Sequence, residues 1–170
     1  QGLHDFGRCV LGSARLSIVD VDGGDQPILS ADAQTGVTFN GAIYGFRQLK
    51  AALSDFPFKT GTDTEVILAL HAKHGDGFLS HLPGMFAFAL WDGPRQTLTC
   101  ARDRFGEKPL YFAQGSQGEF VVASEIKALL ASGLVEPVLS RQALSHYIQR
   151  LPTENRLDRS EEHTSELQSP

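Results

Sequence analysis

The stretch "GMFAFALWDGPRQTLTCARD", residues 84–103, decides the fold. Its first part, residues 84–92, is apolar on both faces of an extended chain, which indicates a buried strand. "GPRQ", residues 93–96, has turn chemistry, and residues 97–103 are predicted to return as the hairpin partner of the first strand. The stretch therefore predicts an antiparallel sheet that contains a buried strand.

Two more strands are predicted upstream of this hairpin. "RLSIVDV", residues 15–21, is β-branched and mostly apolar, and "GVTFN", residues 36–40, ends at the pair Asn40-Gly41. Asn-Gly is a strongly turn-prone dipeptide, so we expect the chain to turn there. Beyond it, apolar residues recur at helical spacing: Ile43, Phe46, Leu49 and Leu53. The pattern predicts a strand-to-helix corner at Asn40-Gly41.

The clearest helix is predicted over "TDTEVILALHAKHG", residues 62–75. Thr62 and Glu65 have the spacing of a capping box, and Asp63 adds an acidic side chain in the first turn. Gly75 is a natural stop for a helix. We expect this helix to bury an apolar stripe against the sheet.

The C-terminal half repeats the alternation of strands and helices. "LYFAQ" and "EFVVAS", residues 110–114 and 119–124, are predicted to form a further strand pair. "SEIKALLAS" and "SRQALSHYIQR", residues 124–132 and 140–150, are predicted to be helices, each with a serine at its N-cap. The order of elements predicts an α+β fold in which helices cover antiparallel sheets.

Composition excludes several classes of function. The chain has 170 residues and a net charge of −5, which argues against a nucleic-acid partner. No apolar run approaches the roughly 20 residues that span a bilayer, so no membrane partner is expected. Cys9 and Cys100 lack metal-ligand spacing, and His71 and His74 share a helix face without a third ligand, so no metal is expected. The low cysteine content favours a cytoplasmic location.

Six motifs then carry a resemblance to a known family. "RLSIVD", "FNGAIY", "TDTEVILAL", "GMFAFALWD", "ARDRFGEKPLY" and "ASEIKALL" occur in the order and spacing of the amino-terminal glutaminase domain of glutamine-hydrolysing asparagine synthetases. The resemblance extends roughly from Leu11 to Leu130. It implies a four-layer αββα sandwich of the amino-terminal-nucleophile hydrolase type, with two stacked antiparallel sheets flanked by helices. It also implies hydrolysis of glutamine to glutamate and ammonia for the ATP-dependent amidation of aspartate.

The resemblance assigns a glutamine pocket. Asn40 and Gly41 match the oxyanion hole, which suits an amide side chain and an unobstructed backbone N–H. Arg15 matches the partner of the substrate α-carboxylate, and Asp63 matches the group that holds the α-ammonium. The residues implied to bind glutamine are Arg15, Leu16, Ser17, Ile18, Val19, Asn40, Gly41, Ala42 and Asp63.

Each of these residues also has a simpler interpretation. Arg15 could be a solvated arginine at a strand end, and a lone Asn40-Gly41 pair is usually a turn or a helix cap. Asp63 is favourable in a first helical turn without any ligand. Likewise, the charged side chains of "ARDRFGEKPLY", residues 101–111, predict a solvated turn with salt bridges.

The sequence departs from the family at several positions. Ala42 stands where a substrate-binding glutamate is usual, and Ser13, Gly45 and Glu107 also differ. The family places its nucleophilic cysteine upstream of Gln1. Cys9 and Cys100 are predicted to be small buried residues, so we expect no glutaminase activity from these 170 residues. No phosphate loop occurs, so no cofactor is expected here, and ATP and magnesium are expected only in a synthetase domain.

The expected organisation has three parts. Residues 1–135 are predicted to be a partial glutamine amidotransferase domain, and residues 136–158 the start of a connection toward a synthetase domain in cis. Residues 159–170 resemble a translated sequencing adapter and are predicted to be a disordered artefact. A homodimer stays open. Two alternatives also stay open, namely another class II amidotransferase and a non-catalytic pseudo-glutaminase that serves as a binding or scaffold domain.

Overall fold

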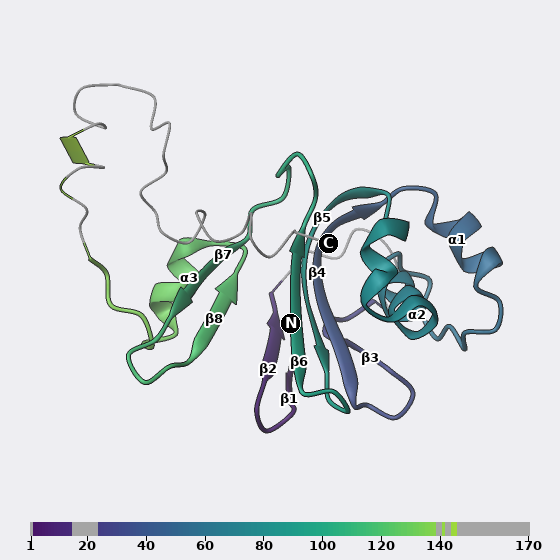
Figure 1. Ribbon diagram of the computed structural model, residues 1–170, viewed down its shortest axis with the longest axis horizontal. Coiled ribbons are helices and arrows are strands. Elements are labelled where there is room, and N and C mark those ends of the chain that lie inside the picture. The colour runs from purple at the N-terminus through teal and green to yellow at the C-terminus, as the bar shows by residue number, and fades with distance from the viewer. Residues whose placement is uncertain (1, 15–23, 139–140, 142–143, 146–170) are drawn as a thin grey trace. The chain divides into compact units, whose positions relative to one another are not determined.

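The computed structural model of the chain describes residues 2–14, 24–138, 141, 144 and 145 (Figure 1). These residues fall into two compact units, residues 1–108 and residues 109–170. The strand predicted over residues 15–21 lies outside the described residues, as do most of the helix predicted over 140–150 and the whole of 159–170.

A four-stranded antiparallel sheet forms the centre of the first unit, in the order β3-β4-β5-β6 (Figure 1). The strands are β3 (Ile28–Leu29), β4 (Thr35–Ile43), β5 (Gly84–Asp92) and β6 (Thr97–Arg102). The hairpin predicted from residues 84–103 is confirmed, with Asp92 opposite Thr97 and Ala87 opposite Arg102. β5 pairs with β4 on one side and β6 on the other. Its side chains are buried on both faces of the sheet, which explains its continuous apolar sequence.

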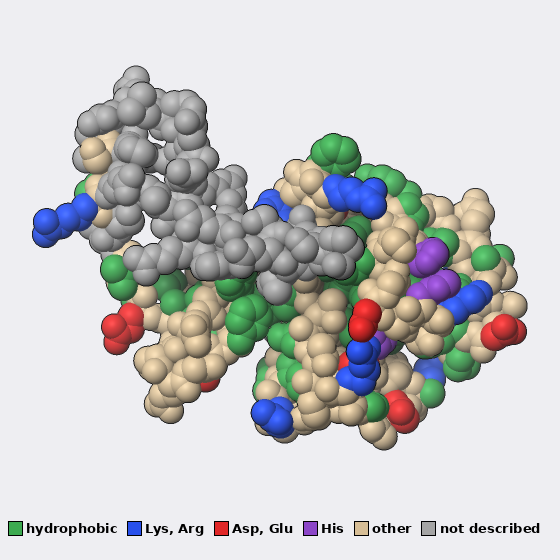
Figure 2. All heavy atoms as spheres, in the orientation of Figure 1, with side chains coloured by type: hydrophobic (Ala, Val, Ile, Leu, Met, Phe, Trp, Pro, Cys, Tyr) green, Lys and Arg blue, Asp and Glu red, His purple; other side chains and the backbone are tan. Residues whose placement is uncertain are grey.

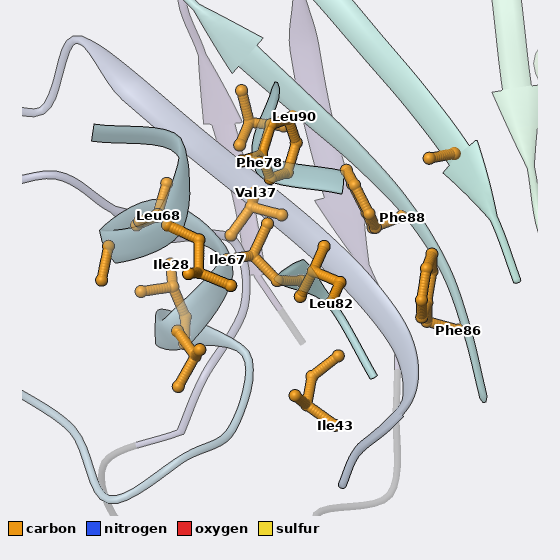
Figure 3. Packing of buried hydrophobic residues seen from close by; sticks show 14 of the residues in the cluster. Ile28, Val37, Ile43, Ile67, Leu68, Phe78, Leu82, Phe86, Phe88 and Leu90 are labelled. Carbon is orange, nitrogen blue, oxygen red and sulfur yellow. The ribbon is translucent and has the colours of Figure 1, made fainter. Parts of the chain in front are cut away.

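Helices cover one face of this sheet (Figure 1). They are α1 (Phe46–Ala52), α2 (Glu65–His74) and the 3-10 helix η1 (Gly75–His81). Figure 3 shows side chains from α2, η1, β4 and β5 meeting in one core. Its labelled members are Ile28, Val37, Ile43, Ile67, Leu68, Phe78, Leu82, Phe86, Phe88 and Leu90. Each fully buried side chain of this size contributes about 1.5–3 kcal/mol of hydrophobic free energy.

A second hairpin lies on the other face of the sheet. It consists of β1 (Gly2–Asp5) and β2 (Val10–Ser13), which the sequence patterns did not predict. Phe6, between the two strands, places its ring centroid 6.4 Å from that of Trp91 in β5. Trp91 alternates with the core residues Phe88 and Leu90 along the strand, so this contact is on the face away from α2.

The predicted corner at Asn40-Gly41 is wrong. β4 continues through both residues to Ile43 and pairs position by position with β5, from Thr35 opposite Asp92 to Ile43 opposite Gly84. The turn comes later, and α1 begins at Phe46 after Gly45, whose φ of +63° ends the extended chain. Long-range pairing with a buried strand outweighs the local turn preference of Asn-Gly.

The predicted capping box is also wrong. α2 begins at Glu65, and its N-cap residue, Thr64, makes no side-chain capping hydrogen bond. The Glu65 carboxylate instead accepts hydrogen bonds from the amides of Lys59 and Thr60, both at 2.8 Å. The predicted stop is confirmed, because Gly75 caps the C-terminus with a φ of +55°.

The second unit is a hairpin with one helix. β7 (Tyr111–Gln114) pairs with β8 (Phe120–Ala123), as predicted. α3 (Ile126–Ala131) follows, and Leu129 is its buried side chain. The predicted serine N-cap is wrong here, because Glu125 occupies that position without a side-chain capping bond.

Candidate functional site

The outer edge of β4 carries backbone amides that are capped by side chains. The Thr35 amide donates to Ser30 Oγ at 3.0 Å, and the Phe39 amide donates to Gln26 Oε1 at 2.7 Å. The Ile43 amide donates to Asp63 Oδ2 at 2.9 Å. Alternate amides of a strand point to the same edge, so the Gly41 amide belongs to this edge too, between those of Phe39 and Ile43.

Gly41 differs from its neighbours along that edge. Among the described residues, no side chain or loop carbonyl outside the sheet accepts a hydrogen bond from its amide. Its φ is +154°, and a Cβ atom there would lie 2.1 Å from the Met85 carbonyl oxygen and 2.8 Å from Phe86 Cα. The position therefore requires glycine, and it presents a backbone donor that is available to a ligand.

Asn40 and Ala42 flank Gly41 on the same strand. Phe39 packs against the core, so the alternation along β4 places the side chains of Asn40 and Ala42 on the opposite face of the sheet. Asn40 is exposed and lies opposite Ala87 of β5. Within the described ranges, an exposed amide side chain therefore lies next to the open Gly41 amide.

Asp63 reaches this strand from a loop 20 residues further along the chain. The structure brings together Asn40, Gly41, Ala42 and Asp63, which are four of the predicted site residues. The other five lie outside the described residues: Arg15, Leu16, Ser17, Ile18 and Val19.

Glu65 fixes the loop that carries Asp63. Its side chain is almost completely buried and accepts hydrogen bonds from the Lys59 amide and from both the amide and the hydroxyl of Thr60. Lys50 lies 3.8 Å from Glu65 Oε2 and donates to the Thr60 carbonyl at 2.6 Å. Since buried charge-assisted bonds of this kind are costly to break, the loop is held in one geometry.

Gln26 is the residue of this site that sequence reasoning missed. It is 3% exposed, and its side-chain amide donates from Nε2 to Thr64 Oγ1 at 3.3 Å while Oε1 accepts from Phe39. In the sequence it belongs to "GGDQP", residues 23–27, which has the composition of a turn. No local pattern marks a glutamine as buried, so only tertiary packing could reveal it.

The turn after β6 is built around Asp103. Its carboxylate accepts hydrogen bonds from four backbone amides, those of Phe86, Phe105, Glu107 and Lys108. Burial alone would raise the pKa of the Asp103 carboxyl, but these four bonds outweigh it and hold the pKa below its ordinary value.

The prediction of a solvated turn with salt bridges is therefore wrong at Asp103, which is buried and bonded to amides. Arg102 contributes in the same way, because its guanidinium donates to the carbonyl oxygens of Gly106 and Lys108. Hydrogen bonds between these two side chains and the backbone therefore organise the turn.

The two cysteines differ in their environment. Cys100 is buried, as predicted, and burial raises the pKa of its thiol to about 12. Cys9 was also predicted to be buried but is only half-buried, and this partial burial still raises the pKa of its thiol. Both environments disfavour the thiolate that nucleophilic catalysis needs.

Histidines gather on the surface of the first unit, where Figure 2 shows their side chains side by side. The rings of His74 and His81 stack with centroids 4.0 Å apart, and His71 meets Phe78 edge to face.

Across the described residues, no three His, Cys, Asp or Glu side chains form a group that could hold a metal ion. Within the same part of the chain, no helix has the length and apolar character to cross a membrane.

Comparison with known proteins identifies the family. Residues 1–168 match the glutamine amidotransferase domain family. The chain belongs to this family. The match covers nearly all of the sequence and agrees with the resemblance seen in the six motifs.

Individual relatives of this amidotransferase domain are asparagine synthetases. Over 129 residues it is 42% identical to the glutamine-hydrolysing asparagine synthetase of Triphysaria versicolor and 44% identical to asparagine synthetase 3 of Arabidopsis thaliana. The corresponding enzyme of Zea mays is 43% identical over the same length. Each alignment covers 76% of this chain and 22% of the relative, so the chain spans about a fifth of the length of these proteins.

A solved structure supports the same assignment at the level of fold. The glutamine phosphoribosylpyrophosphate amidotransferase from B. subtilis, complexed with ADP and GMP, is similar with a TM-score of 0.54 and 30% identity. The similarity covers 64% of this chain and 26% of the B. subtilis chain.

Proposed function

We propose that this amidotransferase domain is the glutamine-binding part of an asparagine synthetase. In the whole protein, glutamine would be hydrolysed to glutamate and ammonia, and the ammonia would amidate aspartate in an ATP-dependent synthetase domain in cis. The single observation that supports this best is the open Gly41 amide between the capped amides of Phe39 and Ile43. The 42–44% identity to asparagine synthetases supports the choice of acceptor reaction.

The geometry suits binding of a glutamine side-chain amide. The Gly41 N–H and the exposed Asn40 side chain can both donate to one carbonyl oxygen, which becomes an oxyanion during hydrolysis. Oδ2 of Asp63 accepts a hydrogen bond from the Ile43 amide, and its other oxygen can accept one from the substrate ammonium group. One end of a glutamine molecule would then meet β4 and the other end would meet Asp63.

We also propose that the domain is a four-layer αββα sandwich of the amino-terminal-nucleophile type. The first unit has helices on one face of its sheet and a hairpin on the other, which is compatible with this fold. ATP and magnesium would belong to the synthetase domain, and we place the whole protein in the cytoplasm.

We further propose that these 170 residues bind glutamine without hydrolysing it. Hydrolysis by this family needs a cysteine thiolate beside a free α-amine. Cys100 is buried with a thiol pKa of about 12, and the nitrogen of Cys9 is a peptide amide. Neither residue can therefore supply the nucleophile and its base.

Calorimetric titration with L-glutamine tests the proposal. We expect weak saturable binding to the chain, and Ala42→Glu should tighten it about ten- to a hundred-fold by adding a charge-assisted bond to the ammonium group. Thr38→Glu is the matched control, because it adds the same charge to the same face of β4 four positions away from Ala42. No binding by either the unmodified chain or Ala42→Glu would refute the proposal.

Ala42 also favours a second candidate, a pseudo-glutaminase that serves as a binding or scaffold domain. The missing carboxylate would leave the pocket too weak for efficient catalysis even in a complete protein. Ammonia release from glutamine by the full-length protein separates the two candidates. Release by the wild-type protein supports the enzyme, whereas release only after Ala42→Glu supports the scaffold.

A further inference from the structure

We propose that Gln26 is a positioning residue, which keeps the Gly41 amide open and sets its place relative to Asp63. This inference rests on the proposed function, because it concerns the same glutamine site. Gln26 would touch no substrate and would act through β4 and the loop before α2. Three observations on the described residues lead to it.

The first observation is where the sheet ends. β3 is two residues long and pairs with β4 only at Gly36 and Val37. A longer β3 would continue the ladder and accept hydrogen bonds from the next alternate amides, including that of Gly41. The short strand therefore exposes the edge of β4 from Phe39 onward.

The second observation is how that edge is completed. An unpaired buried amide is costly, so the Phe39 N–H needs an acceptor. Gln26 Oε1 supplies it at 2.7 Å, and Asp63 Oδ2 does the same for Ile43 at 2.9 Å. Amides on one edge of a strand are two residues apart, so a side chain at that edge reaches one of them, whereas a paired strand would continue to the next. Completing the edge with side chains thus leaves the Gly41 amide free.

The third observation is that Gln26 bonds at both ends of its amide. Nε2 donates to Thr64 Oγ1, and Thr64 is buried next to Asp63 in the chain. Gln26 therefore links the Phe39 amide on one side to the Asp63 loop on the other. In the proposed site, Gly41 and Asp63 contact opposite ends of glutamine, so this link fixes the distance that the ligand must span.

Nuclear magnetic resonance of the ¹⁵N-labelled 170-residue chain tests the inference. Gln26→Met keeps the volume and removes both hydrogen bonds, whereas Gln26→Glu keeps an acceptor for Phe39 and can accept from the Thr64 hydroxyl. Ser30→Ala is the matched control, because it removes the side-chain cap from Thr35 on the same edge. Thr64→Val loosens Gln26 without replacing it, and it serves if Gln26→Met fails to fold.

Two readouts are recorded for each folded variant. In the free protein, Gln26→Met should shift or broaden the Gly41 amide resonance, and Ser30→Ala should leave it unchanged. On titration with L-glutamine, Gln26→Met should raise the dissociation constant about tenfold or more, Gln26→Glu should recover most of the affinity, and Thr64→Val should lie between them. A purely structural role predicts similar behaviour for Gln26→Met and Ser30→Ala.

The outcomes separate this inference from the proposed function. The inference is wrong if the Gly41 amide of Gln26→Met resonates as it does in the wild-type chain. Where Gln26→Met does not fold, the same comparison is made with Thr64→Val. The inference is also wrong if the wild-type chain binds glutamine and the variant compared with it binds glutamine equally well. If the wild-type chain shows no saturable shift with glutamine, the proposed function fails, and the Gly41 resonance of the free variants still decides whether Gln26 positions that amide.

Discussion

Two regions of the first unit use the same interaction to opposite effect. At the turn after β6, one buried carboxylate, Asp103, accepts hydrogen bonds from four backbone amides. At the outer edge of β4, side chains cap the amides of Thr35, Phe39 and Ile43 and pass over Gly41. In the first region, all of these hydrogen bonds stabilise the fold. In the second region, the Gly41 amide has no acceptor among the described residues, and a binding site needs such an available donor.

The difference lies in the geometry of the acceptors rather than in their chemistry. A carboxylate inside a tight turn faces several converging amides, so it can satisfy all of them. Along a strand, amides on one edge are separated by two residues, and each side chain reaches one of them.

Gly41→Ala should have the largest effect. The new Cβ would lie 2.1 Å from the Met85 carbonyl oxygen, and the alanine would have to adopt a φ of +154°. We therefore expect the free energy of unfolding to fall by about 3 kcal/mol or more. Glutamine binding should be lost as well. Gly77→Ala is the control, because nothing lies within 4 Å of its new Cβ, and chemical denaturation should show little change. A stable Gly41→Ala protein would contradict the assigned backbone geometry.

Asp103→Asn should destabilise the protein without touching the glutamine site. An amide NH₂ group would face backbone N–H donors that the carboxylate now binds, at a cost of about 3 kcal/mol in unfolding free energy. The dissociation constant for glutamine should stay at its wild-type value. Asp76→Asn, at an exposed acid, should melt close to the wild-type temperature. Weaker glutamine binding in Asp103→Asn would mean that the two regions are coupled.

Acid should remove the contribution of Asp103 to the free energy of unfolding. Its folded-state pKa lies below the ordinary value of about 3.9, so the stabilisation is complete above about pH 4 and declines as the pH falls through the folded pKa. Urea unfolding at a series of pH values should therefore show the wild-type and Asp103→Asn curves converging below pH 4. Parallel curves throughout that range would show that this carboxylate does not titrate as proposed.

Asp63→Asn should have the smallest effect on stability. The asparagine oxygen can still accept from the Ile43 amide, so we expect a change of about 1 kcal/mol or less. The loss of charge should nevertheless raise the dissociation constant for glutamine about tenfold, since the ammonium group loses its anionic partner. Calorimetry on the two proteins at equal concentration measures this, and equal affinities would remove Asp63 from the site.

Sequence patterns predicted the β5–β6 hairpin, the β7–β8 pair and the body of α2, because each rests on apolar periodicity over several residues. They failed at the ends of elements. The Thr62–Glu65 capping box and the Ser124 cap were local motifs that the fold did not use. The β1–β2 hairpin was missed because its short strands carry little apolar pattern.

The site shows the same division. Asn40, Gly41 and Asp63 were selected by motif, and the structure brings them together on β4 and the loop before α2. The structure corrected the interpretation of Asn40-Gly41, because the pair lies inside β4. Among the described residues, β3 pairs with β4 only at Gly36 and Val37, so no described strand pairs with Gly41 on that edge. Gln26 had no sequence signal, since its importance comes from burial between two segments.

The sequence by itself determined the β5–β6 hairpin, the β7–β8 pair, the body of α2 and the family to which the chain belongs, because periodicity and ordered motifs are properties of the chain alone. Only the tertiary structure decided which donors are satisfied. A strand edge stays open or closes according to where distant residues come to rest. In the part of the chain that the structure describes, the short β3 and the reach of Gln26 and Asp63 leave the Gly41 amide without an acceptor.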